Sequence, residues 1–371
     1  MADSQVIFEE LPAGSGKLGR ITLNVEGTLN SLTLEMVDRL QAQLDSWRED
    51  AAIAAIFIDG AGDRAFCAGG DVQALHASAV AQPGGPCEYA EAFFSREYRM
   101  NYTLHTYPKP LICWGHGIVM GGGLGVMAAC SHRVVTEKTR IAMPEVTIAL
   151  FPDVGGSWFL NHMPGKAGEF LALTGASVNA ADAIYTGVAD RFIASEHKAA
   201  VLAQLLAQEW SGAGESNHAL VRHVLRPLAE QSIGAWPAGQ VEPHMASINA
   251  LCDGDSVHAL IDNITSLETE DPWLIKARDS LAHGSKLAAL WIHRQLWETR
   301  HASLREVFQA EAQLVTNIVR HPEFAEGVRA LLIDKDRTPA WLYPSSREVP
   351  TTVLDQFFTA PWDSNPLADL T

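Results

Sequence analysis

The sequence is poor in cysteine and in basic residues, and both shortages exclude classes of protein. Its five cysteines are spread over 371 residues without a CxxC pair, which is typical neither of a disulfide framework nor of a thiolate metal site. Acidic residues outnumber basic ones by 44 to 27, which gives a formal net charge of -17. Because phosphate backbones and acidic lipids repel an acidic surface, we expect no nucleic-acid partner and no membrane partner.

Long apolar runs and targeting patterns are missing as well. The sequence has no uninterrupted run of about 20 apolar residues, which is the length that a membrane-spanning helix needs. The stretch "MADSQVIFEE" (1–10) has the pattern of neither a signal peptide nor a transit peptide. Together with the unpaired cysteines this favours a cytoplasmic protein, although a presequence removed earlier would leave no trace. The length and the hydrophobic content of 47% allow one or two globular domains.

Familiar nucleotide-binding and hydrolase motifs fail letter by letter. "GSGKLG" (14–19) is not a P-loop, because Leu11 stands where the first glycine belongs. "GHGIVMGG" (115–122) has Met120 in place of the third glycine of a dinucleotide fingerprint. Neither GxSxG nor HExxH occurs, and the histidines show no spacing typical of metal ligands. These motifs therefore indicate no nucleotide-binding or metal-dependent function.

What is present begins with alternating strands and helices. Residues 19–24 and 53–60 are β-prone runs, and the apolar residues between them recur at helical spacing. We expect further strands at 109–117 and 132–137, and a helix in the glycine- and alanine-rich segment 118–131. This order predicts an α/β fold with a parallel sheet and crossover helices.

The later part of the chain is predicted to be mostly helical. Ser303 and Glu306 have the spacing of a capping box, and an apolar stripe follows them. Residues 211–216 have the composition of a loop. We therefore expect an α/β core over residues 1–204, with a mostly helical C-terminal region over residues 205–371 packed on it.

Three segments combine glycine-rich turns with acids in apolar surroundings. They are "AFCAGGD" (65–71), "GHGIVMGGGLG" (115–125) and "MPEVTIALFPDVGG" (143–156). Glycine-rich turns can direct backbone N–H groups at one oxygen and form an oxyanion hole, although tight turns and close helix packing use the same residues. Glu145 and Asp153 lie among Val, Ile, Leu and Phe, where an unpaired ionised carboxylate is costly. Either these acids reach solvent, or they carry a function.

In this order and spacing, the three segments resemble the crotonase (enoyl-CoA hydratase/isomerase) superfamily, with a likeness that covers residues 18–200. The resemblance implies a core built as a spiral of ββα turns, and a site that stabilises an enolate or a tetrahedral oxyanion of a CoA thioester. It implies that the N–H groups of Ala68 and Gly122 are the oxyanion donors. The implied substrate contacts are Asn30, Leu32, Gly69, Gly70 and Asp71.

Within that superfamily, the acids decide the reaction. A typical hydratase has a glutamate two residues after its glycine triplet and a second one at the position of Glu145, and the two hold the water that adds to the double bond. Here Gly125 stands at the first position, so one of the carboxylates that position this water is missing. Asp153 in "FPDVGG", Glu97 in "FFSREY" and the stretch 321–341 instead resemble the thioesterase branch of the superfamily, which acts on 3-hydroxyisobutyryl-CoA.

The resemblance therefore implies hydrolysis of a short branched 3-hydroxyacyl-CoA thioester, with 3-hydroxyisobutyryl-CoA of valine breakdown as the expected substrate. Glu145 would attack the carbonyl carbon or activate a water, and the sequence leaves both routes open. Asp153 would orient the substrate hydroxyl or assist proton transfer, and Glu97 would bind the hydroxyacyl end. CoA enters as part of the substrate, and no metal or redox cofactor is implied.

Other interpretations stay open from the sequence. Asp153 could cap a helix or loop beside Gly155 and Gly156, and Glu97 could lie on a solvated helix face or in an ion pair. The chain could be an enoyl-CoA hydratase or isomerase that uses Glu145 alone as its base, or a non-catalytic relative that only binds CoA. Crotonases commonly form trimers, so a homo-oligomer is one expectation, but the helical extension could cover the surface that they use.

Overall fold

The computed structural model describes residues 4–211 and 214–371, and it divides the chain into two compact units. Unit 1 consists of Met1–Gly70, Met100–Ile141 and Val178–Gln240, and unit 2 consists of Asp71–Arg99, Ala142–Ser177 and Val241–Thr371. Each unit is therefore assembled from three stretches of the chain. Residues on both sides of position 204 belong to unit 1, and the division into a core and a C-terminal region stays a prediction.

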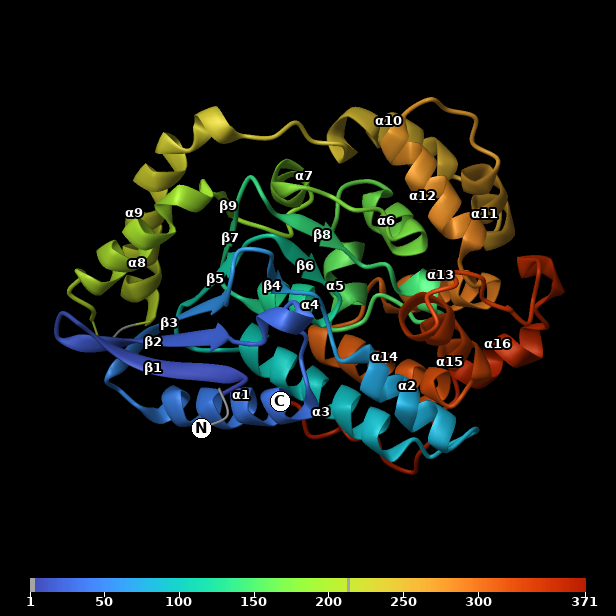
Figure 1. Ribbon diagram of the computed structural model, residues 1–371, viewed down its shortest axis with the longest axis horizontal. Helices are drawn as coiled ribbons and strands as arrows, with labels where there is room; N and C mark the ends of the chain where they lie inside the picture. Colours follow the sequence, from blue (N-terminus) through green and yellow to red (C-terminus); the bar gives the residue numbers. More distant parts are fainter. Residues whose placement is uncertain (1–3, 212–213) are drawn as a thin grey trace. The chain divides into compact units, whose positions relative to one another are not determined.

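A six-stranded sheet runs through unit 1 in the order β1-β2-β3-β5-β7-β9 (Figure 1). β1 and β2 are antiparallel, and every later pair is parallel. The strands are β1 (Val6–Ala13), β2 (Gly16–Leu23), β3 (Ile53–Gly60), β5 (Leu111–Gly115), β7 (His132–Val135) and β9 (Arg191–Phe192). The expected α/β class with a parallel sheet is confirmed, since β2, β3, β5 and β7 fall on the four predicted strands.

Helices of unit 1 cover this sheet. They are α1 (Leu34–Glu49), α4 (Gly122–Ala129), α7 (Ala180–Tyr185), α8 (Lys198–Leu206) and α9 (Gly214–Gln231), with the short 3-10 helices η1 (Glu26–Thr28), η3 (Ser195–His197) and η4 (Ile233–Ala235). α3 (Glu88–His105) contains the boundary between the units. Part of the loop predicted at 211–216 lies outside the described residues, and α9 begins within its second half.

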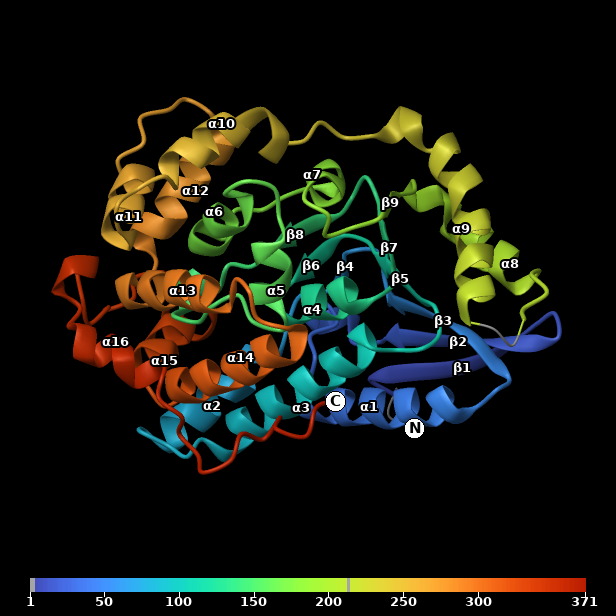
Figure 2. The ribbon, with the colours of Figure 1, turned by 180° about the vertical axis from the view of Figure 1, so that it is seen from behind.

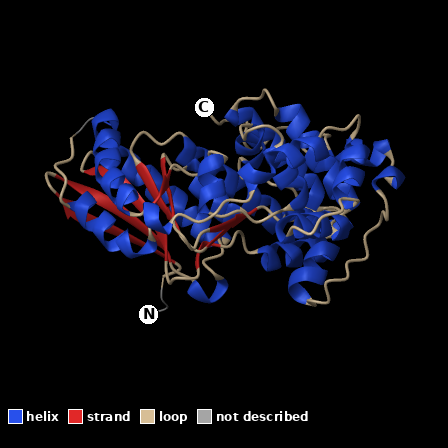
Figure 3. Ribbon diagram, turned by 90° about the horizontal axis from the view of Figure 1, so that it is seen from above, coloured by secondary structure: helices blue, strands red, loops and turns tan. Residues whose placement is uncertain are grey.

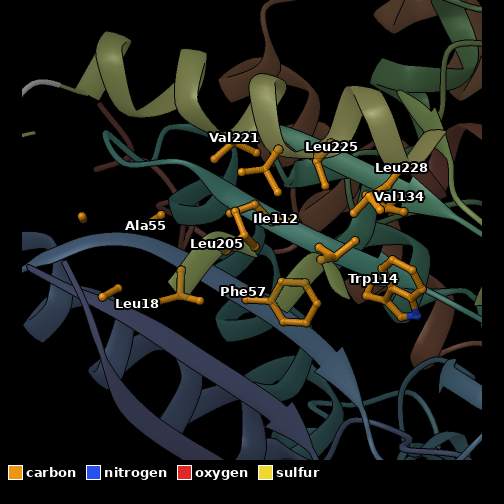
Figure 4. Close-up of a cluster of buried hydrophobic side chains, with 14 of the residues drawn as sticks. Leu18, Ala55, Phe57, Ile112, Trp114, Val134, Leu205, Val221, Leu225 and Leu228 are labelled. Carbon is orange, nitrogen blue, oxygen red and sulfur yellow. The ribbon is translucent and has the colours of Figure 1, made fainter. Parts of the chain in front are cut away.

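The central strands β3 and β5 are buried at every position, which explains why they are apolar along almost their whole length. Leu18 of β2 and Phe57 of β3 pack with side chains of α8 and α9 in one hydrophobic cluster (Figure 4). The next residue of β2, Gly19, points to the other face, where a Cβ atom would lie 2.8 Å from the ring of Trp47 in α1. A glycine is therefore needed for α1 to pack this closely on the sheet.

A smaller sheet carries the glycine-rich segments. Its order is β4-β6-β8, with β4 (Ala65–Cys67), β6 (Ile118–Met120) and β8 (Arg140–Ala142). The helix expected over 118–131 is thus wrong at its start, because the first three residues form β6 and α4 begins only at Gly122. A Cβ atom on Gly123 would lie 2.3 Å from the carbonyl oxygen of Cys67, so α4 packs directly on β4.

Unit 2 is built almost entirely of helices (blue in Figure 3). They are α2 (Val72–Ala81), α5 (Gly156–Asn161), α6 (Ala167–Thr174), α10 (Val241–Leu251), α11 (Val257–Thr265), α12 (Pro272–His283), α13 (Lys286–Thr299), α14 (Leu304–Val319), α15 (Pro322–Val328) and α16 (Thr351–Phe357), with η2 (Glu145–Ile148), the π-helix η5 (Arg329–Ile333) and η6 (Ser346–Glu348). α14 contacts both α13 and α15 (Figure 2), and the predicted capping box of Ser303 and Glu306 is present at its start. No helix among the described residues is long and apolar enough to cross a membrane.

Candidate active site

Glu145 is held at the start of a tight 3-10 turn in unit 2. It opens η2, and its carbonyl oxygen accepts a hydrogen bond of 2.9 Å from the N–H of Leu150. Only 5% of Glu145 is exposed, and its Oε2 atom has no hydrogen-bond partner among the described residues. A buried polar atom without a partner is costly, and the few that occur in native proteins each need a physical explanation.

Asp153 lies on a strained loop between η2 and α5. Asp153 is only 4% exposed, and its Oδ2 atom accepts a hydrogen bond of 2.7 Å from the hydroxyl of Tyr98. The next residue, Val154, has a φ of 54°, and Gly155 has a φ of 83°. A β-branched residue in the left-handed region is a genuine outlier that costs on the order of 1–3 kcal/mol. The carboxylate of Asp153 thus binds a buried tyrosine at the start of a strained turn.

Glu97 and Tyr98 belong to the part of α3 that lies in unit 2. Glu97 is 2% exposed, so it does not lie on a solvated face, and its Oε1 atom has no hydrogen-bond partner among the described residues. Tyr98 is fully buried, and its ring contacts Phe94 and Phe308. Tyr98 was not predicted as a site residue, because one tyrosine beside an acid has no recognisable spacing.

A fourth acid, Glu311 of α14, was also missed. It is fully buried, its Oε2 atom accepts a hydrogen bond of 2.8 Å from the N–H of Gly155, and its Oε1 atom accepts one of 3.0 Å from the N–H of Ser157. A signal for it was available, because position 311 lies on the same helix face as the buried Val307 and Leu314. An acid within an apolar stripe has the same burial cost that marked Glu145.

The carboxyl groups of Glu97, Glu145, Asp153 and Glu311, named here the acid cluster, affect one another's protonation. Burial raises the pKa of Asp153 to about 7, although the hydrogen bond from Tyr98 lowers it. Burial, followed by the negative charge of Asp153, holds the pKa values of Glu97 and Glu145 well above their ordinary range. Burial raises the pKa of Glu311 to about 8, against the effect of the N–H of Gly155. Because packed like charges do not all ionise together, the cluster keeps protons near neutral pH.

The glycine-rich turn of unit 1 follows β4 and lies against the start of α4. The N–H of Gly122 is the first of α4, and the first N–H groups of a helix have no partner within it. Gly69 has a φ of 113°, and a Cβ atom on it would lie 3.7 Å from the nitrogen of Gly122. The structure therefore brings these two predicted site residues together.

Ala68 does not fit its predicted role. Its N–H already donates a hydrogen bond of 3.0 Å to the carbonyl oxygen of Leu29, so it is not available as an oxyanion donor. By contrast, the N–H groups of Gly69 and Gly70 make no hydrogen bond within the part of the chain that the structure describes. The turn therefore still offers a donor, one or two residues further along than expected.

Asn30 and Leu32 hold that turn in place. The Nδ2 group of the buried Asn30 donates hydrogen bonds of 3.0 Å to the carbonyl oxygens of Ala61 and Ala65. The N–H of Leu32 donates one of 2.8 Å to the carbonyl oxygen of Gly69, and the Leu32 side chain is fully buried. These contacts give both residues a supporting role, and their contact with substrate stays a prediction.

Asp71 and Gly125 complete the predicted positions. Asp71 caps α2, because its carboxylate accepts a hydrogen bond of 3.2 Å from the N–H of Ala74. Gly125 is buried within α4, where no side chain can supply the second acid of a hydratase. Over residues 4–211 and 214–371, no group of three or more His, Cys, Asp or Glu side chains is placed to hold a metal ion. The expected lack of a cofactor stays a prediction.

Known proteins match this chain over nearly its whole length. A family model described as enoyl-CoA hydratase/isomerase matches residues 18–358. A curated protein of Danio rerio named "3-hydroxyisobutyryl-CoA hydrolase, mitochondrial" is 37% identical over 360 residues, which are 97% of this chain and 90% of the relative. The Homo sapiens protein of the same name is 36% identical over 361 residues, or 96% of this chain and 89% of the relative.

Solved structures share the fold. A protein of Mycobacterium thermoresistibile titled carnitinyl-CoA dehydratase superposes with a TM-score of 0.86 and 32% identity, covering 98% of both chains. A protein of Rhodobacter sphaeroides titled enoyl-CoA hydratase superposes with a TM-score of 0.81 and 31% identity, covering 96% of this chain and 98% of its own. The names of the curated relatives and of the solved structures therefore point to different reactions on CoA thioesters.

The relatives also correct one expectation and establish another. The curated proteins are named as mitochondrial, which contradicts the expected cytoplasmic location. Unpaired cysteines suit any reducing compartment, so composition could not separate the two. Because the family model matches most of the chain and relatives more than 30% identical cover it, this chain belongs to the enoyl-CoA hydratase/isomerase family.

Proposed function

We propose that this protein hydrolyses the thioester of 3-hydroxyisobutyryl-CoA and releases 3-hydroxyisobutyrate and CoA, a step of valine breakdown. The curated relatives that carry the name of this activity support the proposal. The observation that carries the proposal is the buried pair Glu145 and Asp153. This pair occurs in a chain that has Gly125 at the position where a hydratase has its other acid. Glu145 and Asp153 can serve the attack on a thioester, whereas the pair of carboxylates that holds the water for hydration is incomplete. This combination favours hydrolysis.

Glu145 is assigned the attack on the thioester. In a covalent route its carboxylate adds to the carbonyl carbon, the C–S bond breaks, CoA leaves as the thiolate, and water hydrolyses the resulting anhydride. In a general-base route it removes a proton from the water that attacks the same carbon. Asp153 accepts the one hydrogen bond that the 3-hydroxyl group donates, and Glu97, whose Oε1 atom has no partner among the described residues, binds the same acyl end.

Backbone N–H groups are assigned the role of stabilising the negative oxygen of the transition state. The first donor is the N–H of Gly122, and the second is an N–H of Gly69 or Gly70, since that of Ala68 is already used. Removing one such donor typically lowers the rate by about 10²–10³-fold. No resident metal or redox cofactor takes part in the proposed reaction.

A second candidate function is hydration or isomerisation of an enoyl-CoA with Glu145 as the single base. The titles of the solved relatives, an enoyl-CoA hydratase and a carnitinyl-CoA dehydratase, favour it. Purified protein assayed with 3-hydroxyisobutyryl-CoA and with crotonyl-CoA separates the two, because only hydrolysis releases a free thiol. We expect thiol release from the first and no water addition to the second, and the reverse result would overturn the proposal.

Glu145→Gln tests the proposed attack. We expect kcat to fall by about 10²–10⁴-fold, because an amide neither attacks the carbonyl nor removes a proton from water. Affinity for CoA, measured by calorimetry, should change little. The exposed Glu270→Gln is the matched control and should keep full activity. Full turnover by Glu145→Gln would instead support a non-catalytic role for this acid.

Single turnover in water labelled with heavy oxygen separates the two routes. Label found in the Glu145 carboxylate by mass spectrometry would establish the covalent route, because water then attacks an anhydride formed on that side chain. Label found only in the released acid excludes attack of water on the Glu145 carbon, and it is the result expected of the general-base route.

A further inference from the structure

The loop that carries Asp153 has a conformation that it would not keep alone. Val154 and Gly155 both have positive φ values, and the N–H of Gly156 donates a hydrogen bond of 2.6 Å back to the carbonyl oxygen of Asp153. A valine with left-handed φ persists only where surrounding contacts over-determine the backbone. The direction of the Asp153 side chain therefore depends on whatever holds the next four residues.

Glu311 supplies that hold from a distant part of the chain. Each of its two carboxylate oxygens accepts one backbone N–H, from Gly155 and from Ser157, at 2.8 Å and 3.0 Å. Both N–H groups lie at the start of α5. The N-cap residue of α5 is Gly155, which has no side chain to accept them. A second, longer hydrogen bond also holds Ser157: the Nε2 group of Gln295 in α13 donates to the Ser157 hydroxyl at 3.3 Å.

α14 supports Asp153 from two sides. Glu311 fixes the backbone that follows Asp153, and Phe308, one helical turn earlier, packs against the ring of Tyr98 with centroids 6.0 Å apart. The hydroxyl of Tyr98 in turn donates to the carboxylate of Asp153. One helix therefore constrains both the main chain and the side-chain partner of this acid.

We propose that Glu311 is a positioning residue for hydrolysis: through the N–H groups of Gly155 and Ser157 it fixes where the carboxylate of Asp153 meets the 3-hydroxyl group of the substrate. The inference rests on the proposed function, in which Asp153 binds that hydroxyl group. Glu311 itself touches no substrate, so its effect on the reaction passes entirely through the loop.

The pH profile gives the inference a second readout. The groups that face Asp153 are Glu97 and Tyr98 of α3, Glu145 of η2 and Glu311, and the charge of Asp153 raises the pKa of Glu311. The pKa of Glu311 is raised to about 8, so Glu311 still holds its proton at the pH where Asp153, with a pKa of about 7, loses its own. An uncharged glutamine at position 311 therefore leaves the ionisation of Asp153 where it is. A fall in activity toward the hydroxylated substrate with an unchanged pH profile therefore identifies a positioning effect and not an electrostatic one.

Glu311→Gln in the full chain tests the proposal. The readout is the ratio of kcat/KM for 3-hydroxyisobutyryl-CoA to that for isobutyryl-CoA, which lacks the hydroxyl group that Asp153 binds. We expect this ratio to fall by about 10–100-fold, because a small misplacement of a positioning group costs up to that much. The acid limb of the pH profile should stay at an apparent pKa of about 7, as in the wild type. Glu311→Gln added to Asp153→Asn should change the ratio no further, since both act on one contact.

Controls separate this effect from loss of stability and from failure of the proposed function. Glu306→Gln weakens the capping box of the same helix without touching the loop, and it should leave the ratio and the pH profile unchanged. If Glu311→Gln does not fold, Gln295→Leu is the second test. It removes only the hydrogen bond from Gln295 to the Ser157 hydroxyl, and it should lower the ratio by a smaller factor. An active wild type with an unchanged ratio in the folded variant overturns the inference alone. A wild type that releases no thiol overturns the proposed function, and the inference with it.

Discussion

At the scale of single residues, the ionisation of Asp153 sets what the acid cluster can do. Asp153 accepts a hydrogen bond from substrate more strongly as a carboxylate than as a neutral acid, and burial raises its pKa to about 7, while the hydroxyl of Tyr98 opposes that rise. The proton is therefore lost near neutral pH and not in the acid range typical of aspartate. Small changes around this side chain should move the activity across the neutral range.

We expect kcat/KM for 3-hydroxyisobutyryl-CoA to rise with pH through an apparent pKa of about 7. Tyr98→Phe removes the donor that favours the carboxylate, so the rising limb should move to higher pH. The measurement is a pH profile of kcat/KM for both proteins, with the exposed Tyr185→Phe as the control. A limb that stays in place in Tyr98→Phe would show that Asp153 is not the titrating group.

At the scale of elements, the sequence predicted those strands and helices whose burial repeats regularly. β3 is buried at every position, and α1 places Val37, Leu40 and Leu44 at helical spacing. β1 escaped notice because it is an edge strand, where charged residues and Pro12 are tolerated. β6 has only three residues, too few for a period to show, so it merged into the helix expected after it.

The same contrast applies to the candidate site. Glu145 and Asp153 could be predicted because the cost of burying an acid is visible in the residues next to it. Glu311 could not be linked to Asp153, because its partners Gly155 and Ser157 lie more than 150 positions away, at separations of 156 and 154. The family resemblance located the turn that contains Ala68, but only the hydrogen bond to Leu29 showed that its N–H is occupied.

The packing of α4 on β4 leads to a prediction at this scale. Gly123→Ala places a Cβ atom 2.3 Å from the carbonyl oxygen of Cys67, so the helix must move away from the strand. We expect stability to fall by about 1–3 kcal/mol, with a loss of kcat because the N–H of Gly122 moves with the helix. Thermal unfolding and steady-state assays measure the two effects. Gly27→Ala, where a Cβ atom meets nothing within 4 Å, should change neither.

At the scale of the whole molecule, the acid cluster lowers stability as pH rises. A carboxyl group whose pKa is raised by folding holds its proton more tightly in the folded state. Its favourable contribution is complete below the unfolded pKa and is lost as pH rises through the folded pKa. For Asp153 that window runs from the ordinary value of 3.8 to about 7.

Asp153→Asn should therefore stabilise the protein at alkaline pH while it impairs hydrolysis. Asparagine keeps an oxygen that can accept the hydrogen bond from Tyr98, but it has no charge to bury. We expect the variant to exceed the wild type by on the order of a few kcal/mol above the folded pKa, with the difference shrinking in acid. Urea unfolding at several pH values measures it, and the exposed Asp255→Asn should show no such trend. A difference that does not vary with pH would refute the explanation.

The acid cluster also has a consequence for how the reaction ends. The acyl end of a 3-hydroxyacyl thioester is uncharged, whereas the acid that hydrolysis produces is an anion. In the proposed reaction that anion forms beside Glu97, Glu145 and Asp153, whose carboxyl groups are buried and already too crowded to ionise together. The product must take up a proton or leave, so the burial that raises the pKa values of these acids also favours release of the product.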